Sequence, residues 1–446
     1  MLTLEIANST FPADNIDDAY NACNPDVPLE PGDPRYLDFT NVRGGFNLAK
    51  VIARRIRRTK LPHFHRQLIT GHRGCGKSTE LKQLQAQLKN DNFLAVYVDV
   101  EEVLDLGDIS YLDVLLSIAH TIAKAVANEG LSISQNLVKN LDEWFADKIL
   151  TKEQRRDVEE TLKTEFAVEP KVPLLVRMLV AISGQIRSGS SRKLEIRQIL
   201  EKELSIFISR LNDLIDAVQT QLERLNRNSL VVIVDGLEKM LYRETKEGQS
   251  TYTELFVEHA EQLKAPNCHI IYTVPISLLY NVNLGDSFSE TDVIPMVKIV
   301  YSDGKTPFEN GRNALFQLLS RRMKIEKIFS PEQKIWNFIE MCGGSIRDLL
   351  RLVRYACDET DDYISEQHVE RAIKRMIREY DRLIEDGDLD LLRKISIQRQ
   401  IPGHTVAGRL LHKRLVLEYI SENEERWADL HPCVRHAPRV QEILRS

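Results

Sequence analysis

The chain has 446 residues, of which 43% are hydrophobic and 28% are charged, as in ordinary globular proteins with about two to four domains. Its net charge of −6 argues against a general coat for nucleic acid, although a local basic patch is compatible with it. There is no recognisable signal peptide or membrane span and the six cysteines form no C-x-x-C pair, which excludes the common zinc and disulfide patterns and predicts a cytoplasmic protein without a membrane partner.

Residues 1–45 are rich in Asp, Asn and Pro and show little periodicity, so they are predicted to form an extended N-terminal arm. A helix is predicted over 46–60, because its apolar residues recur on one face. The other face of this helix is basic and carries Lys50, Arg54, Arg55, Arg57 and Arg58. Two interpretations remain open: a solvated face packed against the acidic arm, or a contact with nucleic acid or another phosphate.

The next segments predict a parallel sheet that is covered by helices on both faces, a three-layer α/β core over 46–304. A short strand over 66–70 leads into a glycine-rich loop, and a helix follows from Lys77. Fully apolar runs bounded by polar residues are typical of buried parallel strands. The remaining segments predicted for this core are strands at 93–100, 230–234, 268–274 and 293–300 and a helix at 111–126.

Three further parts complete the predicted architecture. Residues 130–228 contain no convincing strand, so they predict a helical insertion whose amphipathic stretch packs on the chain's own core or on a partner helix. Residues 305–385 predict a helical lid. Residues 386–446 predict small helices and then a hairpin, an order that resembles a winged-helix domain. The hairpin strands are predicted at 414–420 and 426–430.

The strongest motif is a G-x-x-x-x-G-K-S sequence between the strand at 66–70 and the following helix. Its glycines let backbone N–H groups turn toward phosphate oxygens, and the helix directs its positive dipole end at the same anion. Lys77 places a charge for the β- and γ-phosphates, and Ser78 offers a hydroxyl to Mg²⁺. The predicted nucleotide-binding residues are Gly71, His72, Arg73, Gly74, Cys75, Gly76, Lys77, Ser78 and Thr79.

An acidic residue ends the apolar strand at 230–234. Asp235 is expected to face the phosphate crevice and to hold Mg²⁺ through water, the Walker B role. Hydrolysis also needs a group that orients or deprotonates the attacking water. Residue 236 is glycine, so Glu238 is the predicted catalytic carboxylate. The alternative is that Glu238 only caps the following helix and that turnover is slow.

Two further candidates lie downstream. Thr273, near the end of the strand at 268–274, either contacts the γ-phosphate or the attacking water or is an ordinary strand residue. Ser345 is predicted to cap a helix, with Asp348 three residues on. Arg347 lies in the first turn of that helix, where a cation is unfavourable with the helix dipole. Another group should therefore compensate its charge, and a bound γ-phosphate would do so.

The order of these motifs resembles that of AAA+ ATPases, and the lid with its C-terminal hairpin is most similar to the initiator and loader branch. The run at 235–238 also resembles STAND NTPases, a group of signalling relatives. The resemblance implies a P-loop NTPase fold, sensor 1 at Thr273 and sensor 2 at Arg347. It also implies ATP as the nucleotide, since no N-K-x-D motif is present, together with self-assembly and a protein or DNA partner.

The sequence departs from the AAA+ pattern in two ways. The paired acidic residues typical of an AAA+ Walker B are absent, which leaves the rate of hydrolysis open. No arginine finger can be placed by motif, and Arg321 and Arg322 are candidates only.

Three functions remain open at this stage. The first is an ATP-hydrolysing switch or assembly factor that acts on a protein or DNA partner. The second is a slow or inactive nucleotide-gated module in regulation or defence signalling. The third is a DNA-binding loader that uses the winged helix, although the acidic hairpin tip at 421–425 is unfavourable for contact with phosphate. A P-loop kinase is a further alternative, for which no acceptor site is apparent.

Overall fold

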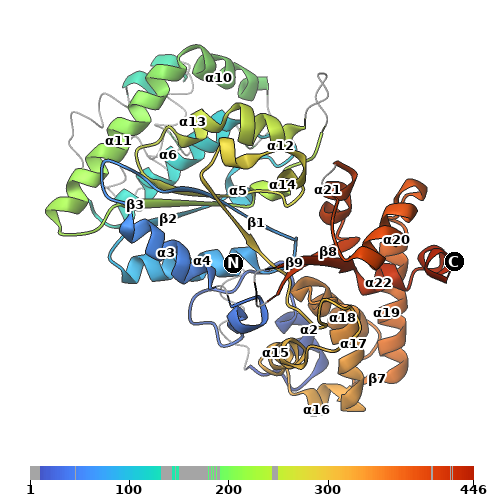
Figure 1. The fold of residues 1–446 in the computed structure, drawn as a ribbon. Helices are drawn as coiled ribbons and strands as arrows, with labels where there is room; N and C mark the ends of the chain where they lie inside the picture. The colour runs from blue at the N-terminus through green and yellow to red at the C-terminus, as the bar shows by residue number, and fades with distance from the viewer. Residues whose placement is uncertain are drawn as a thin grey trace.

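A parallel sheet forms the centre of the chain (Figure 1). A computed structural model describes residues 11–45, 47–131, 143–145, 147–149, 179, 182, 184, 187, 191–243, 250–402, 405–421, 423 and 425–445. The five strands of the sheet lie in the order β2–β3–β4–β1–β5, and each neighbouring pair is parallel. They are β1 (Arg66–Gly71), β2 (Leu94–Asp99), β3 (Leu230–Asp235), β4 (His269–Thr273) and β5 (Glu290–Ile294). The predicted α/β fold class is confirmed.

Helices cover both faces of the sheet, because the strands are apolar on both sides. In β3, Val231 and Ile233 join a core with α3 and α4, whereas Val232 and Val234 join a second core with α6, α10 and α11. Figure 1 shows these two layers below and above the sheet. The helices of this part are α3 (Leu48–Arg58), α4 (Lys77–Asn90), α5 (Val100–Val103), α6 (Tyr111–Asn128), α10 (Ser191–Lys202), α11 (Leu204–Arg224), α12 (Thr251–Thr253), α13 (Ala260–Lys264) and α14 (Leu278–Asn281).

The last strand differs from its prediction at 293–300. β5 occupies Glu290–Ile294 and ends where Pro295 removes a backbone donor. The apolar residues that follow are buried, but their backbone bonds to other segments: Met296 N–H donates to the Glu418 carbonyl, and Lys298 N–H to the Val42 carbonyl. The polar first half of β5 is an edge strand that pairs only with β1. Apolar composition alone therefore placed this strand too late.

The N-terminal arm contains a helix that the sequence did not reveal. α2 (Ile16–Ala22) begins at Asn15, whose side chain accepts from the N–H of Asp18. It packs on helix α18 (Ile346–Cys357), and Ala13 exchanges backbone hydrogen bonds with Arg322 and Lys324. Seven residues are too few to show a helical period, so the prediction of an extended arm was wrong here.

The predicted insertion at 130–228 lies about half outside the described residues. Its described part contains α10 and α11, which are separate helices with a break at Glu203. Both helices pack on the chain's own core. Among the described residues, no helix combines the length and the apolar character needed to cross a lipid bilayer.

The C-terminal third consists of helices and a small hairpin. The lid contains α15 (Glu309–Ser320), α16 (Ile325–Ile328), α17 (Ile335–Met341), α18 and α19 (Glu366–Asp381), with the short pair β6 (Phe329–Ser330) and β7 (Ile364–Ser365). The end of the chain contains α20 (Leu389–Gln398), α21 (Thr405–His412), β8 (Val416–Ile420), β9 (Arg426–Leu430), α22 (Pro432–Arg435) and α23 (Pro438–Arg445). Two helices followed by an antiparallel hairpin form the predicted winged-helix order. The predicted domain limits at 45, 304 and 385 stay predictions.

The hairpin is not a free wing. Both of its strands are almost wholly buried, and Leu417, Tyr419 and Trp427 belong to the same hydrophobic core as α3 and α4. The Tyr419 hydroxyl also donates to the carbonyl of Gly343, at 2.8 Å, just before α18. Figure 1 accordingly shows β8 and β9 between the sheet and the lid helices. The hairpin therefore connects the C-terminal segment to the core around α3 and α4 and to the residues just before α18 of the lid.

Asp348, in the first turn of α18, connects the lid to the C-terminal helices and hairpin. Its side chain is fully buried and accepts from Arg414 at 2.9 and 3.1 Å, from Arg351 at 3.1 Å and from the Tyr380 hydroxyl at 2.9 Å. Burial alone would raise the pKa of Asp348, but the charge of Arg414 and the neighbouring His431 hold it well below its usual range.

Replacing Asp348 by alanine should strongly destabilise the protein, because Arg414, whose side chain is only 16% exposed, would lose this carboxylate partner. Loss of one partner of a buried pair typically costs about 3–5 kcal/mol. The matched control is Asp358→Ala, which removes a half-exposed carboxylate that pairs with Arg375 at 3.2 Å and should cost less than about 1 kcal/mol. Urea unfolding followed by fluorescence measures both. Equal midpoints for the two variants would contradict this role of Asp348.

Candidate nucleotide-binding site

The glycine-rich loop connects β1 to α4 and needs glycine at two positions. Gly74 and Gly76 have φ angles of +88° and +93°, in the left-handed region that other residues rarely adopt. A Cβ atom on Gly74 would lie 2.4 Å from the Cβ of Arg347, so only glycine allows the lid to approach this closely. The backbone N–H of Arg347 donates to the Gly74 carbonyl at 3.3 Å. The loop is therefore in direct contact with the first turn of α18.

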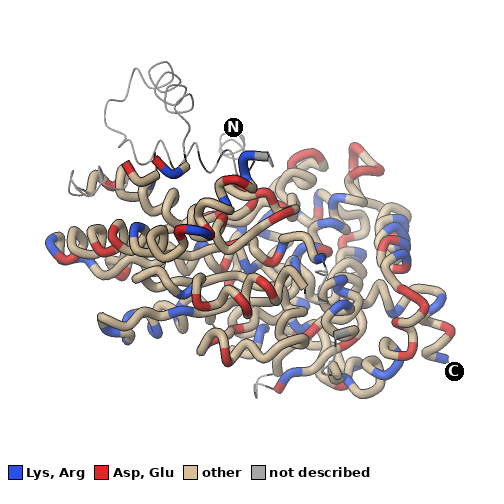
Figure 2. Tube along the Cα trace, turned by 90° about the horizontal axis from the view of Figure 1, so that it is seen from above, with Lys and Arg blue, Asp and Glu red and all other residues tan. Residues whose placement is uncertain are grey.

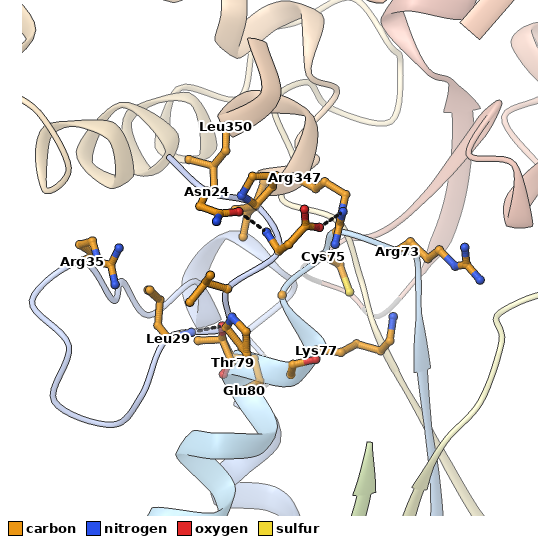
Figure 3. A pocket seen from close by; sticks show the side chains of 18 of the residues that line it. Asn24, Leu29, Arg35, Arg73, Cys75, Lys77, Thr79, Glu80, Arg347 and Leu350 are labelled. Atoms are coloured by element: carbon orange, nitrogen blue, oxygen red, sulfur yellow. Dashed lines mark hydrogen bonds and ion pairs between the residues drawn. The ribbon is translucent and has the colours of Figure 1, made fainter. Parts of the chain in front are cut away.

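A cavity of about 610 Å³ opens beside this loop. Its walls come from the N-terminal arm, the loop with the start of α4, the ends of β2 and β3, and the lid. Figure 3 shows Asn24, Leu29 and Arg35 of the arm on one side of the cavity and Arg73 and Lys77 on the other, with Arg347 and Leu350 of α18 above. A cavity of this size is within the range that small-molecule ligands occupy.

Lys77 lies at the centre of the site, and the residue is only 5% exposed. It donates to the carbonyls of Gly71 and His72 at 3.0 and 3.1 Å and lies 3.3 Å from Oε1 of Glu238. Burial alone would lower the pKa of Lys77, but the charge of Glu238 raises it above its usual value. Lys77 is therefore charged, and all of its partners are oxygens of its own chain.

Two carboxylates share this buried region. Burial and the nearby charge of Glu238 raise the pKa of Asp235, although hydrogen bonds from Ser78 and from the Tyr97 hydroxyl, at 2.6 Å, oppose the shift. Burial would also raise the pKa of Glu238, but the charge of Lys77 and a hydrogen bond from Thr273 keep it below its usual value. Glu238 is thus the more readily ionised carboxylate of the pair.

The oxygen atoms of Asp235, Glu238 and Ser78 fit a magnesium ion whose other ligands are nucleotide phosphates. Asp235 Oδ1 and Glu238 Oε2 are both buried and have no hydrogen-bond partner among the described residues. Carboxylate and hydroxyl oxygens are the ligands that Mg²⁺ prefers, and Ser78 adds a hydroxyl beside Asp235. Nowhere in the described part of the chain do three His, Cys, Asp or Glu side chains group as metal ligands. A cation at Asp235 and Ser78 would therefore rely on nucleotide phosphates and water to complete its shell.

Thr273 holds the turn that follows β3. Its side chain is fully buried at the end of β4, and its Oγ1 accepts from the N–H of Gly236 at 2.9 Å. The same side chain hydrogen-bonds to the Glu238 carboxylate. The structure thus brings Thr273, Glu238, Asp235 and Lys77 together. Their roles in chemistry stay predictions.

Arg347 has a partner that the sequence did not suggest. The predicted N-cap is confirmed, because the Ser345 side chain accepts from the N–H of Asp348. The cation in the first helical turn is compensated by Asp26 of the arm, whose carboxylate accepts from Arg347 Nη1 at 2.6 Å (Figure 3). Asp26 and Arg347 are 321 residues apart in the chain. Arg347 is therefore paired with a carboxylate, whereas the sequence suggested that a bound phosphate would compensate its charge.

The predicted nucleotide-binding residues do not all face the cavity. Those that line it are Arg73, Gly74, Cys75, Gly76, Lys77, Ser78 and Thr79. Thr79 already accepts from the N–H of Leu29 at 3.2 Å, so it also contacts the arm. His72 is buried on the opposite side, and its Nε2 accepts from the N–H of Glu418 in β8 at 2.9 Å. His72 therefore connects the loop to the hairpin instead of facing a ligand.

Several residues of the site were missed by sequence reasoning. Tyr97 and Asp99 lie on β2 beside β3, with Asp99 directly opposite Asp235 in the strand register. A polar residue at the end of a second parallel strand was a usable signal for Asp99. Arg43 donates to the Cys75 carbonyl and lies 3.8 Å from Glu80, and nothing local in the sequence marks it or Asp26.

The two arginine-finger candidates lie differently. Arg322 is 4% exposed and lines the cavity of its own chain, where it donates to the carbonyl of Arg35 at 3.1 Å. It is therefore not placed to reach the site of another subunit. Arg321 is exposed and donates to the carbonyl of Tyr36 in the arm.

The arrangement of strands and loop identifies the fold. The glycine-rich loop follows β1, the acidic residue follows β3, and β4 lies between these two strands. The core has the P-loop NTPase fold. No protein-family model matches the sequence, and no curated protein matches it.

Three solved structures are similar to the chain over nearly its whole length. They are the Aeropyrum pernix ORC2 protein in ADPNP–ADP complexes (14% identity, 95% of this chain and 97% of that chain, TM-score 0.37), the Walker-type ATPase paby2304 of Pyrococcus abyssi (15%, 93% and 100%, 0.36) and Cdc6p from Pyrobaculum aerophilum (12%, 97% and 99%, 0.36). Similarity at this level carries no argument about function, and the fold assignment rests on the strand order and the loop.

His72 should make the stability of the protein depend on pH. Burial, followed by the charge of Lys77, lowers its pKa from 6.5 to about 3. The unfolded chain then binds one more proton than the folded chain between these values, so stability is complete above pH 6.5 and falls as the pH decreases toward 3. Between pH of about 7.5 and 5 the loss from this one group is roughly 2 kcal/mol.

The variant His72→Gln keeps an acceptor for Glu418 N–H but removes the titrating group. Urea midpoints measured at the two pH values should therefore differ less in this variant than in the wild-type protein. The exposed His63, changed to Gln, is the matched control and should retain the wild-type pH dependence. An unchanged pH dependence in His72→Gln would show that His72 is not buried in the neutral form.

Proposed function

We propose that the chain binds ATP with Mg²⁺, hydrolyses it to ADP and phosphate, and uses the bound nucleotide as a switch. The observation that carries this proposal is the buried cluster beneath the P-loop, in which Glu238 lies 3.3 Å from Lys77 and both carboxylates have an oxygen without a partner. Buried polar groups without partners are rare in folded proteins, and a phosphate–magnesium complex would satisfy them.

Binding would exchange the partners of Lys77. Phosphate oxygens would replace the carbonyls of Gly71 and His72 and the Glu238 carboxylate, and backbone N–H groups at the start of α4 would donate to the same phosphates. Arg73 also lines the cavity, and its Nη2 donates at 3.1 Å to the backbone carbonyl of Glu238, the candidate catalytic residue. This exchange would release the Glu238 carboxylate from its ion pair.

The released carboxylate of Glu238 would accept a proton from a water molecule. The water oxygen then bonds to the γ-phosphorus, and the bond from that phosphorus to the β–γ bridging oxygen breaks, giving ADP and phosphate. Mg²⁺ supplies Lewis-acid charge stabilisation when it is bound. Thr273 would fix the turn that carries Glu238, through its contacts to Gly236 N–H and to the carboxylate.

A slow timer is the second candidate function. Glu238 is held by Lys77 and Thr273, and the residue after Asp235 is Gly236 and not a second carboxylate. If this arrangement persists with nucleotide bound, the protein would retain ADP after purification and show negligible turnover. Steady turnover by the isolated protein would exclude this candidate. Nucleotide content and turnover of the purified protein separate the two functions.

A polyanionic partner is supported by α3. Lys50, Arg54 and Arg58 are exposed and, within the described residues, form no side-chain hydrogen bond or ion pair. Elsewhere Figure 2 shows acidic and basic residues interspersed along most of the chain. The arm pairs its carboxylates with other cations, such as Lys82 and Arg347, and not with these three. We infer that nucleic acid binds at α3, because the hairpin strands are buried.

The variant Glu238→Gln should lower the rate of ATP hydrolysis by about 10²- to 10⁴-fold, the usual contribution of a general base. ATP affinity should stay equal or increase, because the neutral amide no longer competes with phosphate for Lys77. Phosphate release and equilibrium nucleotide binding measure the two effects. The control is Glu261→Gln, at a glutamate whose side chain is 84% exposed. An unchanged rate in Glu238→Gln would show that another group activates water.

The double variant Arg54→Gln/Arg58→Gln should weaken the binding of duplex DNA. The loss of affinity relative to the wild-type protein should be larger at lower salt concentration. If both cations contact phosphate, the slope of log K against log salt should fall by about 2. Arg393→Gln/Lys394→Gln removes the same charge from two exposed cations in α20 and is the matched control. Loss of binding in that control alone would place the nucleic acid on the C-terminal helices instead.

A further inference from the structure

We propose that Asp26 sets the preference of the site between ATP and ADP, by occupying Arg347 in the place that a γ-phosphate would take. The proposal rests on the proposed function, in which the cavity beside the P-loop binds these nucleotides. A carboxylate and a phosphate oxygen present the same chemistry to a guanidinium group, since both are anionic acceptors that bind it through charge-assisted hydrogen bonds. Asp26 and Arg347 both line the cavity.

The contact uses only part of Arg347. Nη1 donates to Asp26 at 2.6 Å, whereas Nε is buried and has no hydrogen-bond partner in the part of the chain that the structure describes. The backbone N–H of the same residue is already bonded to Gly74 in the P-loop. The guanidinium group therefore lies beside the phosphate-binding loop and retains a free donor, which a phosphate with several oxygens would satisfy.

The ion pair can open without releasing the arm. The arm is held separately by the bond from Leu29 N–H to Thr79, by the ion pair of Glu30 with Lys82, and by the bond from Arg321 to the Tyr36 carbonyl. The side chain of Asp26 is 71% exposed, so it returns to water at little cost when Arg347 turns away. Exchange of the partner of Arg347 is thus a local event.

The competition affects the two nucleotides unequally. ADP ends at the β-phosphate, and Arg347 can remain on Asp26 while ADP is bound. The γ-phosphate of ATP gains Arg347 only by breaking the pair with Asp26, so its net gain is reduced by the strength of that pair. Asp26 therefore weakens ATP binding and leaves ADP binding unchanged. Removing its charge should raise the selectivity for ATP.

The test compares Kd values of a non-hydrolysable ATP analogue and of ADP, measured by competition with a fluorescent nucleotide at fixed salt and Mg²⁺. Asp26→Asn should bind the ATP analogue about two- to five-fold more tightly, which corresponds to the usual strength of an exposed ion pair. Its affinity for ADP should be that of the wild-type protein. In an Arg347→Gln background, Asp26→Asn should have no effect on either nucleotide.

Glu30→Gln is the matched control, because it removes an arm-to-core ion pair that does not involve Arg347. It should leave the ratio of the two affinities unchanged. An equal effect of Asp26→Asn on both nucleotides, or the same change in Glu30→Gln, would overturn the proposal and indicate general loosening of the arm. Failure of the wild-type protein to bind either nucleotide would instead overturn the proposed function, and this inference with it.

Discussion

The ammonium group of Lys77 is almost completely removed from water, and a charge in that position must be surrounded by oxygen atoms. Two carbonyls of the loop and the Glu238 carboxylate meet this requirement. Burial raises the pKa of the neighbouring Asp235, and the negative charge of Glu238, which pairs with Lys77, raises it further. Tyr97 and Ser78 then partly stabilise Asp235 through hydrogen bonds. These side chains thus form one buried network around the Lys77 cation.

The same loop is the meeting point of segments that are distant in sequence. The arm reaches it through Arg43, which donates to the Cys75 carbonyl, and α18 reaches it through Arg347 N–H. The hairpin reaches it through Glu418 N–H, which donates to His72. Each contact is a single hydrogen bond of modest net strength. A ligand that shifts the loop by a fraction of an ångström would therefore change the hydrogen bonds of the arm, the lid and the hairpin to the loop at the same time.

Local signals in the sequence predicted much of the site. The P-loop, Asp235 and the Ser345 cap each depend on a few adjacent residues, and the strand ends that carry Asp235 and Thr273 meet because the strands are parallel. The partner of Arg347 could not be predicted in this way. The need for a compensating anion followed from the helix dipole, but Asp26 lies 321 residues away and only the fold brings it there.

The hairpin illustrates a signal that was present but not used. In β8, apolar residues lie on both faces of the strand, as Val416, Leu417 and Tyr419 show, whereas a wing that faces solvent would alternate with polar residues. Composition therefore indicated burial on both sides. What it could not indicate was the surroundings, in which Glu418 is buried against the P-loop and its hydroxyl donor is Tyr280, at 2.9 Å.

Adjacent residues of α18 have opposite physical roles. Asp348 is fully buried among three donors, and breaking such a set leaves a buried charge, so α18 and the C-terminal hairpin stay together in any low-energy rearrangement. Arg347 is paired with an exposed carboxylate, and that pair is weak enough to exchange for a ligand. Exchange at Arg347 is therefore local, whereas any movement of α18 itself would carry the C-terminal helices and hairpin with it through the pair of Asp348 with Arg414.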